Sequence, residues 1–131
     1  MSDSDDQAII KYRLERARES LLEARLLAEA EQWSGCVNRL YYASFYAVSA
    51  LLQLHGITPK THAGVRSEFS HQFVRTNLVA TEWSIFYNEL FLSRQKADYQ
   101  DFMTPSEQLV RPWLDQAEQF VNTISALIDT Q

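Results

Sequence analysis

Glycine and proline, the residues that most often interrupt helices, occur only three times each in this chain of 131 residues. Long helix-prone stretches remain between them, and none alternates apolar and polar residues over several positions. Strands of half-buried sheets show that alternation, whereas amphipathic helices repeat apolar residues every three or four positions. The sequence therefore predicts an all-α fold, an antiparallel bundle of four to five helices, within one domain that spans residues 1–131.

Apolar periodicity and capping residues predict where the helices lie. We expect helices over about Asp6–Glu31, Trp33–Leu54 and His62–Arg75, from near Thr81, and from Ser106 to Ile128. Residues 1–6 are then expected to be flexible, and the Arg and Glu face of the first helix to be solvated. Thr61 and Ser106 are expected N-caps, and Gly56 a left-handed helix end. The fifth helix is expected to bury Leu109, Trp113, Ala117, Phe120, Ile124 and Leu127.

The composition argues against several classes of protein. A single cysteine, Cys36, rules out an internal disulfide and a cysteine-based zinc site. The spacing of His55, His62 and His71 does not suit a metal site, so we expect neither a metal nor a cofactor. No stretch approaches the roughly 20 apolar residues of a membrane span. The acidic start, MSDSDDQ, does not resemble a targeting peptide, so we expect a cytoplasmic protein without membrane contact.

Charge is distributed unevenly along the chain. The net charge is −5, but residues 33–81 carry a net +3 between flanking blocks of −3 and −5. The basic residues of this middle block are Arg39, Lys60, Arg66 and Arg75. This basic block either binds an anion such as RNA backbone or pairs with the acidic helices beside it.

One stretch combines an apolar helical face with two polar residues. It reads NRLYYASFYAVSALL and covers residues 38–52. A helix so apolar is typical of the centre of a bundle or of a subunit interface. Asn38 and Arg39 lie one turn from its start, where unpaired polar groups are costly to bury, so they need partners in an ion pair or a polar cleft. The expected core face is Val37, Leu40, Tyr41, Val48, Leu51 and Leu52.

A second stretch, SRQKADYQDF at residues 93–102, offers such partners. Arg94 and Asp98 are four positions apart and meet on one face if the helix continues. Tyr99 lies about 140° around an ideal helix from Arg94, so all three converge only where the helix bends or ends. On this spacing alone, the stretch is either a charged helix end or part of a site.

Taken in order, NRLYYASFYAVSALL, GITPKTHAGVRSEFSHQFV and RQKADY resemble the HEPN superfamily, in particular its small standalone proteins. The resemblance spans about residues 8–128. It implies a helical bundle that forms a homodimer through its central helices, with a cleft at the interface. In HEPN ribonucleases an arginine, followed four to six residues later by a histidine, lines that cleft. Many such proteins are toxins paired with a minimal nucleotidyltransferase, and some of these partners attach AMP to a tyrosine.

The resemblance assigns roles to individual residues. Arg94 matches the motif arginine, but Tyr99, Gln100 and Asp101 occupy the positions where the histidine belongs. The candidate catalytic residues are therefore Arg94, Asp98 and Tyr99, and Tyr99 is also a candidate for nucleotide attachment. The candidate cleft residues for binding are Asn38, Arg39, Tyr42 and His62.

Three functions stay open after these observations. The preferred one is the HEPN component of a toxin–antitoxin or defence-type pair with a minimal nucleotidyltransferase, binding nucleotide or RNA at a degenerate motif. The second is an active metal-independent endoribonuclease toxin. The third is a non-catalytic helical adaptor dimer, because an Arg–Asp–Tyr cluster can also serve packing alone.

Overall fold

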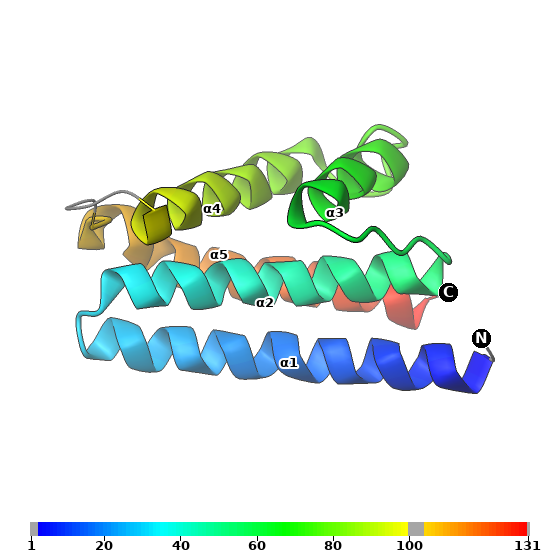
Figure 1. The fold of residues 1–131 in the computed structure, drawn as a ribbon, viewed down its shortest axis with the longest axis horizontal. Coiled ribbons are helices and arrows are strands. Elements are labelled where there is room, and N and C mark those ends of the chain that lie inside the picture. The colour runs from blue at the N-terminus through cyan, green and yellow to red at the C-terminus, as the bar shows by residue number, and fades with distance from the viewer. Residues whose placement is uncertain (1–2, 100–103, 131) are drawn as a thin grey trace.

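The computed structural model describes residues 3–99 and 104–130, and within these ranges it contains helices and no strand. The elements are α1 (Asp3–Glu29), α2 (Trp33–Leu54), α3 (His62–Phe69), a short π-helix η1 (Ser70–Val74), α4 (Thr81–Tyr99) and α5 (Glu107–Asp129). Helices α1 and α2 lie antiparallel, α5 runs behind α2, and α3 and α4 cover the bundle from above (Figure 1). The predicted all-α fold is confirmed.

The helix boundaries agree with the sequence patterns at most ends. Helix α2 has the predicted bounds, whereas α1 already begins at Asp3, so residues 3–6 are helical. It ends at Glu29, because Glu31 has a left-handed φ of 58°. The predicted third helix consists of α3 and the π-helix that continues it to Val74.

The expected helix ends are also confirmed. The side chain of Thr61 accepts a hydrogen bond from the backbone of Gly64 at 2.9 Å, which caps α3. Ser106 caps α5 by accepting from the backbone of Leu109 at 3.2 Å. Gly56 has a φ of 73°, a conformation that a residue with a side chain rarely adopts.

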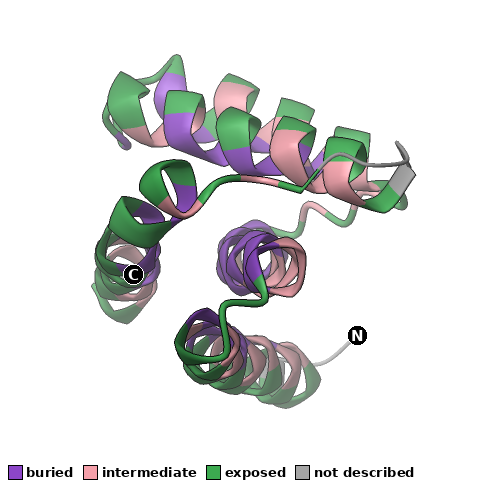
Figure 2. Cartoon of the chain, turned by 90° about the vertical axis from the view of Figure 1, so that its left-hand side faces the viewer, coloured by how far each residue is buried: buried purple, intermediate pink, exposed green. Residues whose placement is uncertain are grey.

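Helix α2 lies at the centre of the hydrophobic core. Its predicted core residues are all buried, namely Val37, Leu40, Tyr41, Val48, Leu51 and Leu52. Ala43 and Ala47 of α2 and Ala17 and Ala24 of α1 are fully buried, and their small side chains let the two helices approach closely. Figure 2 shows the buried side of α2 turned toward α5 and its partly buried side turned away.

Aromatic side chains join α3 and α4 to α5. The ring of Phe120 in α5 lies 5.3 Å from Trp83 and 6.0 Å from Tyr87, both of α4, and 5.8 Å from Phe69 of α3, between ring centroids. Rings at these distances gain favourable edge and offset contacts beyond the burial of their apolar area. Phe120 therefore fixes how α3 and α4 sit on the rest of the bundle.

One part of the predicted α5 stripe is wrong. Trp113, Ala117, Phe120 and Ile124 are buried as expected, but Leu109 is 48% exposed. The next residue, Val110, is fully buried in its place. The buried face of α5 therefore begins one position later than the sequence pattern indicated. In the described part of the chain, no helix has the length and apolar character needed to cross a bilayer.

Candidate functional site

Two neighbouring tyrosines of α2 form the centre of a polar and aromatic cluster. Tyr41 is fully buried, and its hydroxyl lies 2.7 Å from Nδ1 of His62 in α3. Tyr42 is only partly buried, and its ring meets the His62 ring edge to face at 5.8 Å. The guanidinium of Arg94 in α4 lies over both tyrosines, 5.0 Å from the centroid of Tyr41 and 5.4 Å from that of Tyr42. We call Tyr41, Tyr42, His62 and Arg94 the tyrosine cluster.

Arg94 makes the ion pair that its spacing predicted. Its Nε lies 3.2 Å from Oδ2 of Asp98, one turn further along α4. The N–H is not aimed at that oxygen, so the contact is a charge pair without a hydrogen bond, and the buried Nε has no hydrogen-bond partner within the described residues. The arginine side chain is only 13% exposed. Contacts with aromatic faces thus hold a cation whose hydrogen-bond donors are left for another partner.

The partners of Asn38 and Arg39 differ from those expected at residues 93–102. Arg39 donates from Nε and Nη2 to Oδ1 of its neighbour Asn38, at 3.0 and 2.7 Å, and its Nη1 lies 3.3 Å from Oε1 of Glu23 in α1. The local bond wins because both side chains leave the same turn of α2. The guanidinium of Arg39 still lies 5.0 Å from the centroid of Tyr42, which also contacts Arg94. Tyr42 therefore lies in contact with both arginines.

His62 follows the cap of α3, which places its ring against α2. The ring stacks on Phe45 at 4.4 Å between centroids and an interplanar angle of 16°. Burial lowers the pKa of His62 below its ordinary value of 6.5, and the nearby positive charge of Arg94 lowers it further. The imidazole is therefore neutral at pH 7, and within the described residues its Nε2 has no hydrogen-bond partner.

Tyr41 fixes the orientation of this imidazole. Burial raises the pKa of the Tyr41 phenol to about 12, so the hydroxyl keeps its proton at neutral pH. In the His62 tautomer with its proton on Nε2, Tyr41 donates to Nδ1 and leaves Nε2 as a donor. In the other tautomer the ring donates to the phenolic oxygen and Nε2 is an acceptor. Either way, the buried hydroxyl holds the ring beside Arg94.

The sequence patterns missed two arginines of α1 that lie on the same side of α2. Arg13 and Arg16 belong to the face expected to be solvated, yet both are partly buried. Arg13 donates to the backbone oxygen of Ser49 at 3.1 Å, and the guanidinium of Arg16 lies 5.4 Å from the centroid of Tyr46. Arg16, Arg39 and Arg94 thus each contact a tyrosine of α2. The polar positions 13, 16, 20 and 23, spaced by three or four residues, are the pattern that marked this second face.

Other predicted site residues fall where the structure gives less. Tyr99 is the last residue of α4, and its side chain lies outside the described residues, as do Gln100 and Asp101. Among the described residues no group of three or more His, Cys, Asp or Glu is placed to hold a metal ion. Of the seven predicted site residues, the structure places Asn38, Arg39, Tyr42, His62, Arg94 and Asp98 on connected parts of one surface.

Known proteins similar to this chain agree on one family. The family model described as HEPN domain matches residues 10–127. A protein of Thermotoga maritima named UPF0332 protein is 40% identical over 126 residues, which cover 96% of each chain. Two proteins of Methanocaldococcus jannaschii, MJ0605 and MJ0142, carry the word toxin in their names. MJ0605 is 33% identical over 88% of this chain and 85% of its own length, and MJ0142 is 40% identical over 66% of this chain and 58% of its own.

Proposed function

Since this chain belongs to the HEPN domain family, we propose that it is the HEPN component of a toxin–antitoxin or defence-type pair and that it binds RNA or nucleotide through Arg94. Two relatives with toxin in their names support the toxin assignment. A cytoplasmic location accompanies the proposal, because its ligand and partner would be found there.

The observation that carries this proposal is the state of Arg94. Its guanidinium is held on the rings of Tyr41 and Tyr42 and makes no hydrogen bond within the described residues. Phosphate oxygens are the acceptors that a planar guanidinium fits best, because two parallel N–H groups can bind one phosphate. The single carboxylate of Asp98 near Nε leaves the Nη groups for such a ligand.

We also propose that a second copy of the chain completes the site. Tyr42, Phe45 and Tyr46 of α2 pack against the core but stay partly exposed, on the side of α2 that no other helix covers (Figure 2). A two-fold pair of chains meeting on this side would bury these rings and bring two copies of Arg94 to one cleft.

The partner of the pair is proposed to be a minimal nucleotidyltransferase that modifies Tyr99. In that reaction the Tyr99 phenolic oxygen attacks the α-phosphorus of ATP, pyrophosphate leaves and the phenol proton passes to water. We expect induction of this chain alone to inhibit growth, and co-expression with a minimal nucleotidyltransferase to relieve the inhibition. The intact mass of the chain should then increase by one or more AMP groups, which is measured by mass spectrometry.

Tyr99→Phe and Tyr12→Phe serve as matched variants for this experiment. Tyr12 is an exposed tyrosine of α1, far from α4 in the sequence, so its replacement should leave the adduct in place. Loss of the adduct in Tyr99→Phe alone supports the proposal. If the parent chain neither inhibits growth nor gains mass, the proposal is wrong and the adaptor dimer is the better description.

A second candidate function, a metal-independent endoribonuclease, is favoured by the position of His62. The motif histidine is missing from the sequence after Arg94, but His62 lies against the same two tyrosine rings as Arg94. A neutral imidazole there can accept the proton of a ribose 2′-hydroxyl that attacks the adjacent phosphorus. Arg94 would stabilise the negative charge of the phosphorane-like transition state, and the 5′ oxygen would leave.

The pH dependence of RNA cleavage tests this second candidate. Because the pKa of His62 lies below 6.5, the neutral base persists into mildly acid solution, and the cleavage rate should begin to fall only below pH 6.5. His62→Gln should reduce the rate about 10²-fold and remove this acid limb. His71→Gln, at an exposed histidine of η1, is the control. Equal rates in the parent and His62→Gln would exclude His62 as the base.

A further inference from the structure

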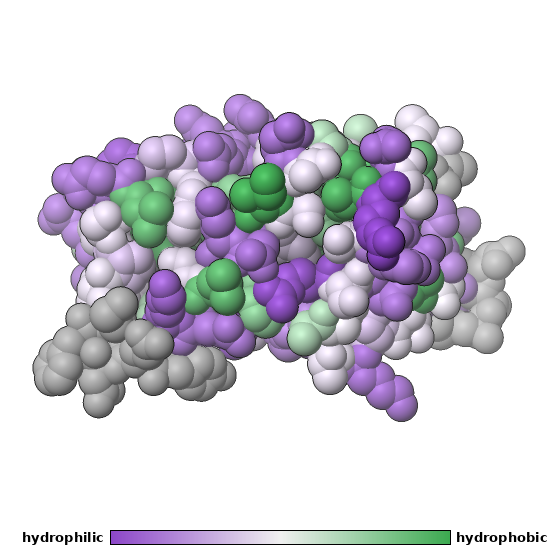
Figure 3. Space-filling model, turned by 90° about the horizontal axis from the view of Figure 1, so that it is seen from above, coloured by the Kyte–Doolittle hydropathy of each residue, from purple (hydrophilic) through white to green (hydrophobic). Residues whose placement is uncertain are grey.

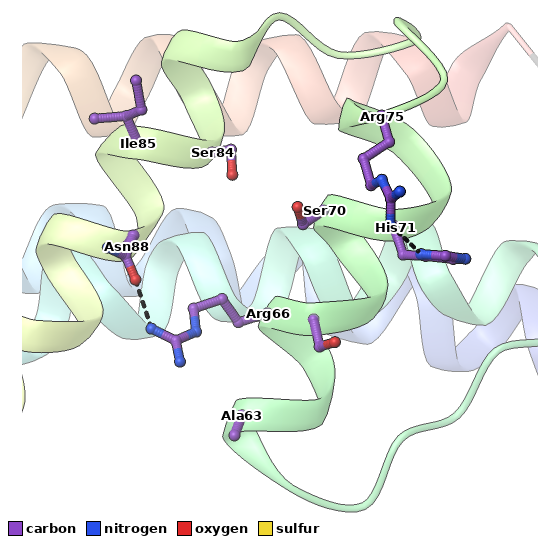
Figure 4. A pocket seen from close by; sticks show the side chains of 9 residues that line it. Ala63, Arg66, Ser70, His71, Arg75, Ser84, Ile85 and Asn88 are labelled. Carbon is purple, nitrogen blue, oxygen red and sulfur yellow. Dashed lines mark hydrogen bonds between the residues drawn. The ribbon is translucent and has the colours of Figure 1, made fainter.

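A separate open pocket of about 480 Å³ lies between α3, η1 and α4. Figure 4 shows Arg66 reaching from α3 toward Asn88 of α4, while Ser70 and Ser84 project into the space between the helices. The nine lining residues include no aspartate or glutamate, and they are Ala63, Arg66, Ser67, Ser70, His71, Arg75, Ser84, Ile85 and Asn88. Seen from above, this face mixes hydrophilic side chains with separate hydrophobic ones (Figure 3).

The arginines of this pocket are bound to neutral groups. Arg66 donates from Nη1 to Oδ1 of Asn88 at 2.5 Å, and Arg75 donates from Nη1 to Nδ1 of His71 at 3.1 Å. Neither arginine has a carboxylate within ion-pair distance among the described residues. Of the two interpretations of the basic block, pairing with the acidic helices therefore fails for these two residues. Their charge is available to an external anion.

The π-helix η1 sets the positions of the donors. The backbone N–H of Arg75 bonds to the oxygen of Ser70 at 2.9 Å, an i to i+5 step that widens the helix by one residue. Ser70, His71 and Arg75 consequently line the same pocket. Since a guanidinium only donates, Nδ1 of His71 is the acceptor, and the neutral ring carries its proton on Nε2 as one more donor.

We propose that this pocket binds a backbone phosphate of the RNA strand that the tyrosine cluster holds. Two guanidiniums, an imidazole N–H and serine hydroxyls form a donor set suited to phosphate oxygens. The inference rests on the proposed function, because the strand is the ligand of Arg94. Its affinity should fall steeply with salt, as expected when phosphates are neutralised by arginines.

Arg66 connects the pocket with the tyrosine cluster. It follows His62 by one helical turn of α3, and its guanidinium lies 4.0 Å from the centroid of Phe91. The ring of Phe91 in turn meets Tyr41 at 6.0 Å. A strand with one phosphate at Arg94 thus finds a second set of phosphate donors along the same edge of α3.

The test is a titration of the isotopically labelled chain, followed by NMR at the backbone amides of Ser67 and Ser70 and the side chain of Asn88. The probes are inorganic phosphate, AMP and a short single-stranded RNA. We expect all three to shift these signals, RNA at the lowest concentration. Arg75→Gln should weaken the RNA effect about tenfold, because it removes charged hydrogen bonds to a phosphate.

Arg18→Gln is the matched control, since Arg18 is also exposed and bonds to an asparagine, Oδ1 of Asn122 at 2.6 Å. It removes the same charge from another face and should leave these shifts unchanged. Equal effects of Arg75→Gln and Arg18→Gln would overturn the inference, as would shifts with phosphate or AMP but not with RNA. Arg94→Ala separates the two proposals: if it weakens RNA binding while Arg75→Gln does not, only the pocket assignment fails.

Discussion

Replacing Arg94 with alanine is expected to abolish growth inhibition by this chain and to weaken RNA binding by about 10- to 100-fold. The estimate follows from losing one or two charge-assisted hydrogen bonds, each worth about 1.5–3 kcal/mol. If the chain cleaves RNA, the rate should fall about 10²- to 10³-fold, as when another preorganised donor to a transition-state charge is removed. Fluorescence anisotropy with labelled single-stranded RNA measures the binding, and induction in a bacterial host measures the inhibition.

The loss must be separated from unfolding. Arg94 contributes to stability through its contacts with Tyr41 and Tyr42 and its pair with Asp98, together about 1 kcal/mol. Arg94→Ala should therefore unfold at only slightly lower denaturant concentration than the parent. Arg94→Lys keeps the charge but not the planar fork, and should restore only part of the binding. Unchanged inhibition and RNA affinity in a folded Arg94→Ala chain would contradict the proposed function.

Local spacing predicted those parts of the site that a single helix determines. Arg94 and Asp98 meet because residues four apart share a helix face, and Thr61 caps α3 because its side chain reaches the backbone three residues later. The meeting of His62 with Arg94 depends instead on how α3 packs against α2. No local spacing contains that information, so the sequence gave no reason to expect a histidine beside the arginine.

The partners of Arg39 show a second limit of sequence patterns. Burial cost predicted that Asn38 and Arg39 would have partners, and this is confirmed. The choice between Glu23 and residues 93–102 was open, because both carry acids and the rotation of α1 about its axis decides between them. The same rotation brings Arg13 and Arg16 of α1 onto the side of α2 that the pattern left to solvent.

The fold itself was predictable because its helices repeat apolar residues at regular intervals. The π-helix at Ser70–Val74 was not, since an extra residue per turn changes no composition and leaves Phe69 and Phe73 on the buried side. It matters for function, because the same insertion places Ser70 and Arg75 on one wall of the basic pocket.

The largest loss of stability is expected from Phe120→Ala. Phe120 is fully buried and contacts the rings of Phe69, Trp83 and Tyr87, so its removal leaves a cavity where α3, α4 and α5 meet. Replacing a buried phenylalanine with alanine costs about 3–5 kcal/mol of unfolding free energy. Urea denaturation followed by circular dichroism measures this cost. Because α3 and α4 carry His62 and Arg94, the variant should also lose RNA binding at temperatures where it remains partly folded.

Leu109→Ala is the decisive companion to Phe120→Ala. Apolar periodicity placed both residues on one buried stripe of α5 and would predict large losses for both. In the structure Leu109 is 48% exposed, so its replacement should change the unfolding free energy by only about 0.5 kcal/mol. Phe120→Leu, which keeps most of the volume, should cost about 1 kcal/mol. Similar large losses for Leu109→Ala and Phe120→Ala would mean that α5 is rotated from the orientation described above, and the contacts that hold α4 and Arg94 in place would have to be redrawn.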